Sequence, residues 1–276
     1  MRTVKLLTLL LAAFALTFVA CNDDDDDNPS LAVEINNIEI SDDNQTVTIT
    51  FNQAVYKNND MTGNIDANSF ALTFVATNPV NAQFSANHTA GDAVVTLTIV
   101  YNDRVDGDEI LEVTAKAGTF FGAEGNSVDQ DLDVSVDVND LGIIGKWSAY
   151  DISKVLEDNG FDDSLYANFY ADQSYLVTAY LGGLPLELTG TYEMTKTEFD
   201  DIWEITLNQA SPNALVSQGI FKVFAAAQDS MWYEVAQIDP VIPGVTPPTA
   251  EEGFGSTSGG FIGTDNVQKY YWIGQE

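Results

Sequence analysis

The sequence predicts an all-β protein with two domains, a β-sandwich followed by a closed antiparallel barrel. Short runs of Val, Ile, Leu and Tyr alternate with Thr, Ser and Asp along the chain, and a period of two is the pattern of a strand with one buried face. Asn, Asp and Gly separate these runs, as expected for turns. The 276 residues, of which 45% are hydrophobic and 11% aromatic, suffice for two packed cores.

Residues 1–20 are predicted to be a signal peptide. A short basic region precedes the apolar stretch 6–19, which is too short to span a bilayer comfortably. The stretch ends at "FVAC", where Cys21 is the only cysteine of the chain. This segment resembles the bacterial lipobox, and the resemblance implies that Cys21 is lipidated and anchors the protein to a membrane. An ordinary secretory signal with an incidental cysteine is the alternative.

Residues 21–30 are predicted to form an acidic tether. Five consecutive aspartates, residues 23–27, repel one another and stay solvated. An acidic run directly after the lipidated cysteine resembles the export signal of Bacteroidota-type surface lipoproteins. We therefore expect an outer-membrane protein exposed at the cell surface, with a spacer facing the periplasm as the alternative.

Residues 31–140 are predicted to form the sandwich. Strand patterns occupy residues 33–40, 46–51, 70–75, 80–84, 95–99, 111–115 and 132–138. Seven short strands within ~110 residues are typical of an immunoglobulin-like sandwich. The stretches "IEISDDNQTVTITFNQAVYKNN", "DANSFALTF" and "GDEILEVTAKAGTFFGAEGNSV" resemble bacterial Ig-like domains of cell-envelope proteins. That resemblance implies a spacer that raises the following domain above the membrane.

Residues 141–276 are predicted to form an eight-stranded barrel. The first strand starts at Gly145, and seven more patterns cover residues 165–171, 174–181, 186–194, 202–208, 219–227, 230–237 and 267–273. Eight antiparallel strands joined by short turns close into a barrel that admits one small ligand. A short helix within residues 152–159 is expected to plug or flank one end.

The barrel sequence resembles lipocalin-like domains in "GKW" at its first strand and in the runs "FYADQSY" and "LTGTYEM". In lipocalins the tryptophan of the first motif packs against an arginine from a late strand. The chain has only Arg2 and Arg104, and neither lies in this domain. Lys269 on the final strand is the expected substitute.

The composition excludes several functions. The net charge of -32 argues against nucleic-acid binding. With one histidine, His88, which falls in the sandwich, the barrel has no catalytic Ser-His-Asp triad and no zinc site of His and Cys ligands. We predict neither a cofactor nor an enzyme. Calcium is the one ion considered, at two Asx-rich loops, residues 42–44 and 137–140, although such turns commonly bind nothing.

Carboxylates on the predicted barrel strands are the remaining catalytic candidates. Glu187, Glu193, Glu204 and Glu234 alternate with apolar residues, which predicts that they face solvent rather than one another. A glycosidase would need two that face each other across a cleft, about 5–10 Å apart. A carboxylate-based hydrolase is therefore the hypothesis ranked last.

Aromatic residues give the binding hypothesis. All four tryptophans lie in the barrel region, and the ligand-binding candidates are Trp147, Trp232, Tyr270 and Trp272. Such residues line apolar pockets or stack on sugar rings. The Pro- and Gly-rich stretch 239–261 is the expected binding edge. We predict that the barrel binds a small apolar molecule or a glycan; the alternative is a structural or adhesive protein that contacts other envelope proteins.

Overall fold

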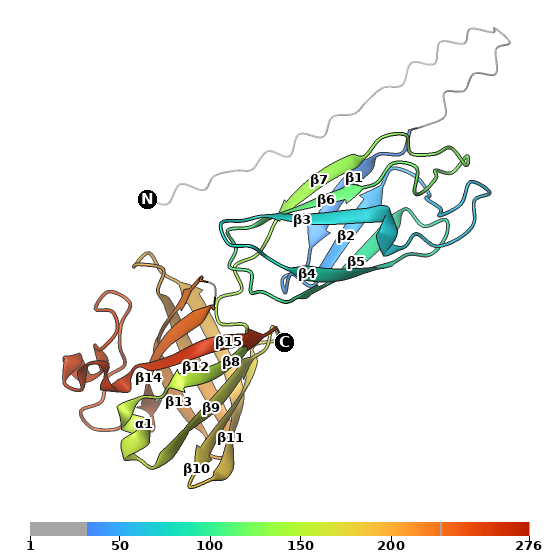
Figure 1. Cartoon of the computed structure of the whole chain (residues 1–276). Coiled ribbons are helices and arrows are strands. Elements are labelled where there is room, and N and C mark those ends of the chain that lie inside the picture. The colour runs from blue at the N-terminus through green and yellow to red at the C-terminus, as the bar shows by residue number, and fades with distance from the viewer. Residues whose placement is uncertain (1–31, 227, 276) are drawn as a thin grey trace, which may run out of the picture. The chain divides into compact units, whose positions relative to one another are not determined.

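The computed structural model describes residues 32–226 and 228–275 (Figure 1). The predicted signal peptide, Cys21 and the acidic tether lie outside the described residues. Residues 32–276 form one compact unit, and its regular structure is strands with a few short helices, so the predicted all-β class is confirmed. No helix in the described part of the chain is long and apolar enough to cross a membrane.

The first domain consists of two antiparallel sheets. One sheet has the order β1-β2-β5-β4 and the other β3-β6-β7. This order corresponds to the A-B-E-D and C-F-G sheets of a constant-type immunoglobulin domain. The strands are β1 (Ile35–Ile40), β2 (Thr46–Phe51), β3 (Phe70–Val75), β4 (Ala82–Asn87), β5 (Val94–Tyr101), β6 (Ile110–Ala115) and β7 (Leu132–Asp137), with the 3-10 helix η1 (Ala67–Ser69) before β3.

The sandwich core follows from the period-two pattern. Along β2, Val47, Ile49 and Phe51 point inward and are buried, while the threonines between them are half-buried on the other face. Leu111 and Val113 of β6 face them from the second sheet, and all belong to one hydrophobic cluster. Burial of apolar surface, which stabilises the fold by about 25 cal/mol for each Å² removed from water, holds the two sheets together.

The second domain is a closed barrel. Each strand pairs antiparallel with the next, and the last pairs with the first, so no strand edge is left open. The strands are β8 (Gly145–Asp151), β9 (Phe161–Phe169), β10 (Ser174–Leu181), β11 (Leu184–Lys196), β12 (Trp203–Ser211), β13 (Leu215–Phe224), β14 (Ser230–Asp239) and β15 (Gln268–Gly274). The predicted eight-stranded antiparallel barrel is confirmed.

Two non-strand segments lie at one end of the barrel. Helix α1 (Lys154–Asp158) is capped by Ser153, whose hydroxyl accepts the N–H of Leu156. The long connection between β14 and β15 contains the short 3-10 helices η2 (Thr257–Gly260) and η3 (Gly263–Asn266). Leu156 of α1 packs against the barrel core, and α1 in turn contacts η3 of the connection.

Candidate ligand cavity of the barrel

Trp147 closes one end of the barrel interior. It projects inward from β8, is fully buried, and donates its indole N–H to the carbonyl of Ile143 at 2.7 Å. Phe169 and Phe221, both buried, belong to the same hydrophobic cluster. Neither Trp147 nor Phe221 borders the barrel cavity described below, so this end forms the floor of the barrel.

Arg104 contacts the floor tryptophan. Its guanidinium carbon lies 6.0 Å from the centroid of the Trp147 ring, and its Nη2 donates to the Gly142 carbonyl at 2.6 Å. The sequence predicted Lys269 for this place, and that prediction is wrong. Lys269 pairs with Asp151 at 2.6 Å and lies over the ring of Trp232 instead. The arginine comes from the loop after β5, so the preceding domain supplies the group that the barrel sequence lacks.

Burial of Arg104 has an electrostatic consequence. Loss of solvent lowers the pKa of its guanidinium, and the charges of Asp140, Asp229 and nearby acids oppose that shift. Its Nε is the one buried side-chain polar atom without a hydrogen-bond partner among the described residues. The positive charge is thus held by several surrounding carboxylates rather than by one direct ion pair.

Above the floor the barrel encloses a cavity of about 190 Å³. A cavity of this order accommodates one small ring. Most of its lining is aliphatic or aromatic, which favours an apolar guest. The lining residues are Leu156, Phe161, Leu165, Ala167, Phe169, Tyr175, Val177, Ala179, Leu188, Leu207, Gln209, Leu215, Ser217, Met231, Tyr233, Val235, Gln268 and Tyr270.

Three tyrosines bring hydroxyl groups to the cavity. Tyr175 comes from β10, Tyr233 from β14 and Tyr270 from β15, and all three are buried. The Tyr233 and Tyr270 rings meet edge to face at 6.1 Å. The Tyr270 hydroxyl donates to Oε1 of Gln268 at 2.6 Å. The cavity therefore combines an apolar wall with a small set of convergent polar groups.

The same tyrosines stay protonated at neutral pH. Burial raises the pKa of Tyr175 to about 12 and raises the pKa of Tyr270 further above its ordinary value. Burial also raises the pKa of Tyr233, and the neighbouring Tyr270 and Tyr175 add to that shift because ionised tyrosines would repel one another. The hydroxyls are thus hydrogen-bond donors rather than anions.

A wider groove of about 810 Å³ adjoins the cavity. The two share Leu156, Val235 and Gln268, so the groove lies at the mouth opposite the Trp147 floor. Its outer wall comes from the long β14–β15 connection, where Ile242 is 43% and Phe261 89% exposed. The predicted binding edge is therefore located at the mouth of the barrel.

Glu234 fastens this connection to the barrel. Its carboxylate accepts the N–H groups of Gly255 at 2.6 Å and Thr257 at 3.1 Å, and the hydroxyl of Thr257 at 2.5 Å. The sequence predicted that Glu234 faces solvent, but it is fully buried because the connection folds over the outer surface of β14. Glu187, Glu193 and Glu204 are exposed as predicted.

The four ligand-binding candidates of the sequence occupy different places. Tyr270 lines the cavity. Trp147 belongs to the floor. Trp272 is half-buried and packs so close to Gly145 that a Cβ added to this glycine would lie 2.7 Å from the Nε1 of Trp272. Trp232 is on the outer surface and contacts Phe224 and Phe254 edge-on. The structure thus brings only Tyr270 of the four to the cavity.

Sequence reasoning missed Tyr175 and Tyr233. Both lie at inward positions of strands that alternate, so the period-two pattern places them inside the barrel. The pattern does not show whether an inward tyrosine fills the core or borders a cavity. A tyrosine at an inward position places a polar hydroxyl group inside the barrel, where it needs a hydrogen-bond partner. That requirement is the signal in the sequence that would have indicated the site.

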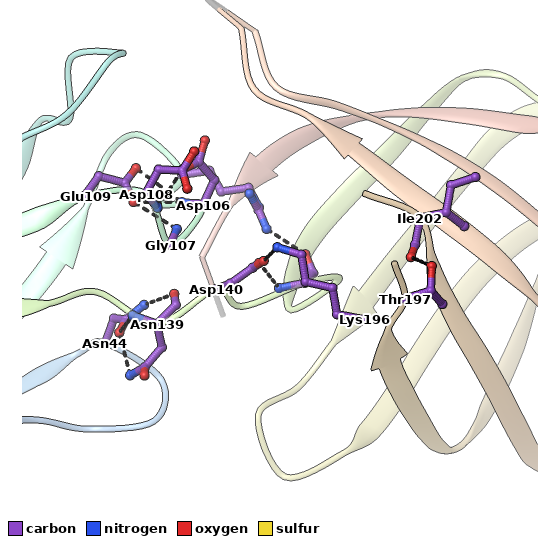
Figure 2. Close-up of polar contacts among 12 residues, drawn as sticks. Asn44, Asp106, Gly107, Asp108, Glu109, Asn139, Asp140, Lys196, Thr197 and Ile202 are labelled. Carbon is purple, nitrogen blue, oxygen red and sulfur yellow. Dashed lines mark hydrogen bonds and ion pairs between the residues drawn. The ribbon is translucent and has the colours of Figure 1, made fainter. Parts of the chain in front are cut away.

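The loops considered for calcium are joined by hydrogen bonds (Figure 2). The Asn44 side chain donates a hydrogen bond to the Asn139 carbonyl at 2.8 Å and accepts one from the Asn139 N–H at 2.9 Å. Asp140 instead accepts the ammonium group of Lys196 at 2.7 Å. Nearby, Glu109 accepts the N–H groups of Asp106 and Gly107. No cluster of three or more His, Cys, Asp or Glu residues suited to a metal occurs in the part of the chain described.

Comparison of the chain with protein-family models, with curated proteins and with solved structures found no significant match.

Proposed function

We propose that the barrel is a binding domain that takes up one small, mostly apolar molecule without altering it. The observation that carries the proposal is the cavity of about 190 Å³ inside a closed barrel, which shares Leu156, Val235 and Gln268 with a groove at its mouth. An apolar pocket with a few convergent polar groups is the usual form of a small-molecule site.

We also propose that the protein is a lipoprotein of the outer membrane, exposed at the cell surface, with the sandwich as a spacer. The support is in the sequence, where Cys21 stands between an apolar stretch and five aspartates. In cells fed with labelled palmitate we expect the label on the wild-type protein and none on Cys21→Ser. Equal labelling of both proteins would refute the anchor at this position.

Binding is tested with N-phenyl-1-naphthylamine, an uncharged dye whose fluorescence rises in apolar surroundings. Residues 32–276, which form one compact unit, should bind the dye saturably with one site per chain, its phenyl ring in the cavity and its naphthalene in the adjoining groove. Ala179 is buried and lines the cavity, so Ala179→Phe should abolish the signal by occupying the space. Ala210, exposed on β12 of the same barrel, provides the control Ala210→Phe, which should bind normally.

Circular dichroism separates a blocked cavity from a misfolded barrel. If Ala179→Phe fails to fold, the smaller Ala179→Leu replaces it and should weaken binding in a folded protein. Dye binding that is equal in the wild type, Ala179→Leu and Ala210→Phe would show that the dye lies outside the cavity, and the proposed function would be wrong.

A glycan remains the second candidate ligand, because one aromatic cluster lies on the outer surface. Tyr150 and Tyr271 stack at 4.1 Å between ring centroids, and both are at least 40% exposed, with Trp232 nearby on β14. Flat aromatic faces of this kind complement the C–H surfaces of sugars. Binding of an oligosaccharide that Tyr271→Ala removes and Ala179→Phe leaves unchanged would favour this candidate.

A further inference from the structure

The described residues that line the cavity include no ionised side chain. The polar members are Gln209, Ser217, Gln268 and the three tyrosines, and burial keeps those tyrosines neutral at pH 7. A charged ligand group would lose its hydration without gaining a counter-charge, which is costly in an apolar interior. The chain as a whole is strongly acidic, so a carboxylate or phosphate is disfavoured further.

Two hydroxyl groups of the cavity can each donate a hydrogen bond to a ligand. Tyr175 and Tyr233 make no hydrogen bond through their hydroxyls within the described part of the chain, so both O–H groups are available. The Tyr270 hydroxyl is bound to Gln268, which leaves the two N–H groups of that amide. If the Gln268 amide is turned by about 180°, one of its N–H groups donates to the Tyr270 oxygen. The Tyr270 O–H and the other N–H are then the two free donors.

Tyr175 and Tyr233 lie toward the inner end of the cavity. The Phe169 ring, part of the floor, is 6.1 Å from the ring of Tyr175 and 6.5 Å from that of Tyr233. Toward the mouth the wall becomes aliphatic, with Leu156 and Val235 leading into the groove, where Ile242 and Phe261 continue it. The Tyr175 and Tyr233 rings are thus near the floor, whereas Gln268 and the aliphatic Leu156 and Val235 border the opening.

From this arrangement we infer that the ligand is an uncharged molecule whose hydrogen-bond acceptor, a carbonyl, ester or ether oxygen, is held by the Tyr175 and Tyr233 hydroxyls, while its apolar tail extends through the mouth into the groove beneath Phe261. The inference rests on the proposed function and names the ligand class of the same cavity. Neither hydroxyl is sealed off from the cavity, so a ligand acceptor at this position can take the hydrogen bonds that no group in the described part of the protein accepts.

The inference is tested by competition among molecules that share one tail. 2-Octanone carries a neutral acceptor, octanoate a negative charge and octylamine a positive charge at pH 7.5. Residues 32–276 loaded with N-phenyl-1-naphthylamine are titrated with each compound. We expect 2-octanone to displace the dye at a concentration more than about tenfold below those of the two ions.

Variants identify the hydroxyls that hold the acceptor. Tyr233→Phe and Tyr175→Phe should each lower the affinity for 2-octanone about three- to tenfold, which is the effect of one hydrogen bond. Both variants should leave the affinity for the dye unchanged. Tyr271→Phe removes a hydroxyl from the exposed outer cluster and should change neither. Octanoate binding as tightly as 2-octanone, or 2-octanone binding unchanged in both cavity variants, would overturn the inference. Failure of the dye itself to bind would instead refute the proposed function.

Discussion

The two domains use the same strand pattern but fill their interiors differently. In the sandwich, Val47, Ile49, Val95, Leu97 and Leu111 are all completely buried and the two sheets share one hydrophobic core. In the barrel, the inward positions include Tyr175, Tyr233 and Tyr270, and a cavity remains between them. Alternation of apolar and polar residues therefore predicts which face is inward, whereas the size and polarity of the inward residues decide whether space is left.

The difference follows from the way in which each architecture closes. Two open sheets approach each other until their side chains interlock, so the core of a sandwich closes on itself. A barrel has a radius fixed by its strand number, and side chains cannot draw the walls together. Ala167 and Ala179, two small inward residues of β9 and β10, therefore leave volume in the barrel that a sandwich would have removed.

Matched truncations test this comparison with the largest expected effect. Leu97→Ala in the sandwich should lower the free energy of unfolding by about 2–5 kcal/mol, since it creates a cavity in a filled core. Leu207 of β12 is also buried but borders the existing cavity, so its side chain has fewer contacts to lose. Leu207→Ala should cost about half as much. Urea unfolding followed by circular dichroism measures both, and equal losses would contradict the distinction.

Most of the fold was predictable because each strand carries its own pattern. The predicted and observed bounds of β2, β3 and β10 coincide, and the remaining strands differ by a few residues at their ends. The sequential strand order of the barrel followed from strand number and mostly short turns, whereas the order β1-β2-β5-β4 of the sandwich pairs strands that are not consecutive. Burial of Glu234 was not predictable, because it depends on a connection whose Pro and Gly residues carry no periodic pattern.

Long-range partners were equally hidden from the sequence. The arginine over Trp147 was sought within the barrel region, yet Arg104 comes from the preceding domain, 43 positions earlier in the chain by residue number. A local pattern cannot report a contact between segments so far apart. The tyrosine cluster is a further case, because Tyr175, Tyr233 and Tyr270 meet only once the barrel has closed.

Arg104 allows the two domains to be tested as one unit. Arg104→Gln should lose the charge over Trp147 and the charge-assisted bond to Gly142, lowering the stability of the barrel by about 2 kcal/mol. All four tryptophans are in the barrel, so denaturation followed by tryptophan fluorescence reports that domain alone. The control Lys269→Gln breaks a partly exposed ion pair with Asp151 and should cost less than about 1 kcal/mol. An Arg104→Gln barrel as stable as the wild type would show that the two domains are independent.

The buried tyrosines predict a loss of barrel stability in alkali. Their pKa values are raised in the folded state, to about 12 for Tyr175, so above pH 10 the unfolded chain releases protons that the folded chain retains. Stability is therefore unaffected below pH 10 and falls between pH 10 and 12, by about 1.4 kcal/mol per pH unit for each such tyrosine. Tyr233→Phe should make the loss of stability per pH unit smaller by the contribution of one tyrosine. Tyr271→Phe, at an exposed position, should leave this slope unchanged. Tryptophan fluorescence in urea at several pH values measures the slope.

Glu234 gives the smallest expected effect and the most local one. Its carboxylate receives three hydrogen bonds from Gly255 and Thr257, so the connection over β14 is held by one side chain of the barrel. Glu234→Gln keeps the shape but replaces one acceptor oxygen by a donor, which should cost about 1 kcal/mol. Because the strands themselves are untouched, hydrogen exchange should rise within residues 240–266 and remain unchanged in β10 and β11.

The control variant is Glu204→Gln, at an exposed position of β12, which should alter hydrogen exchange in neither region. Faster exchange throughout the barrel in Glu234→Gln would mean that the connection supports the whole domain rather than only the wall of the groove.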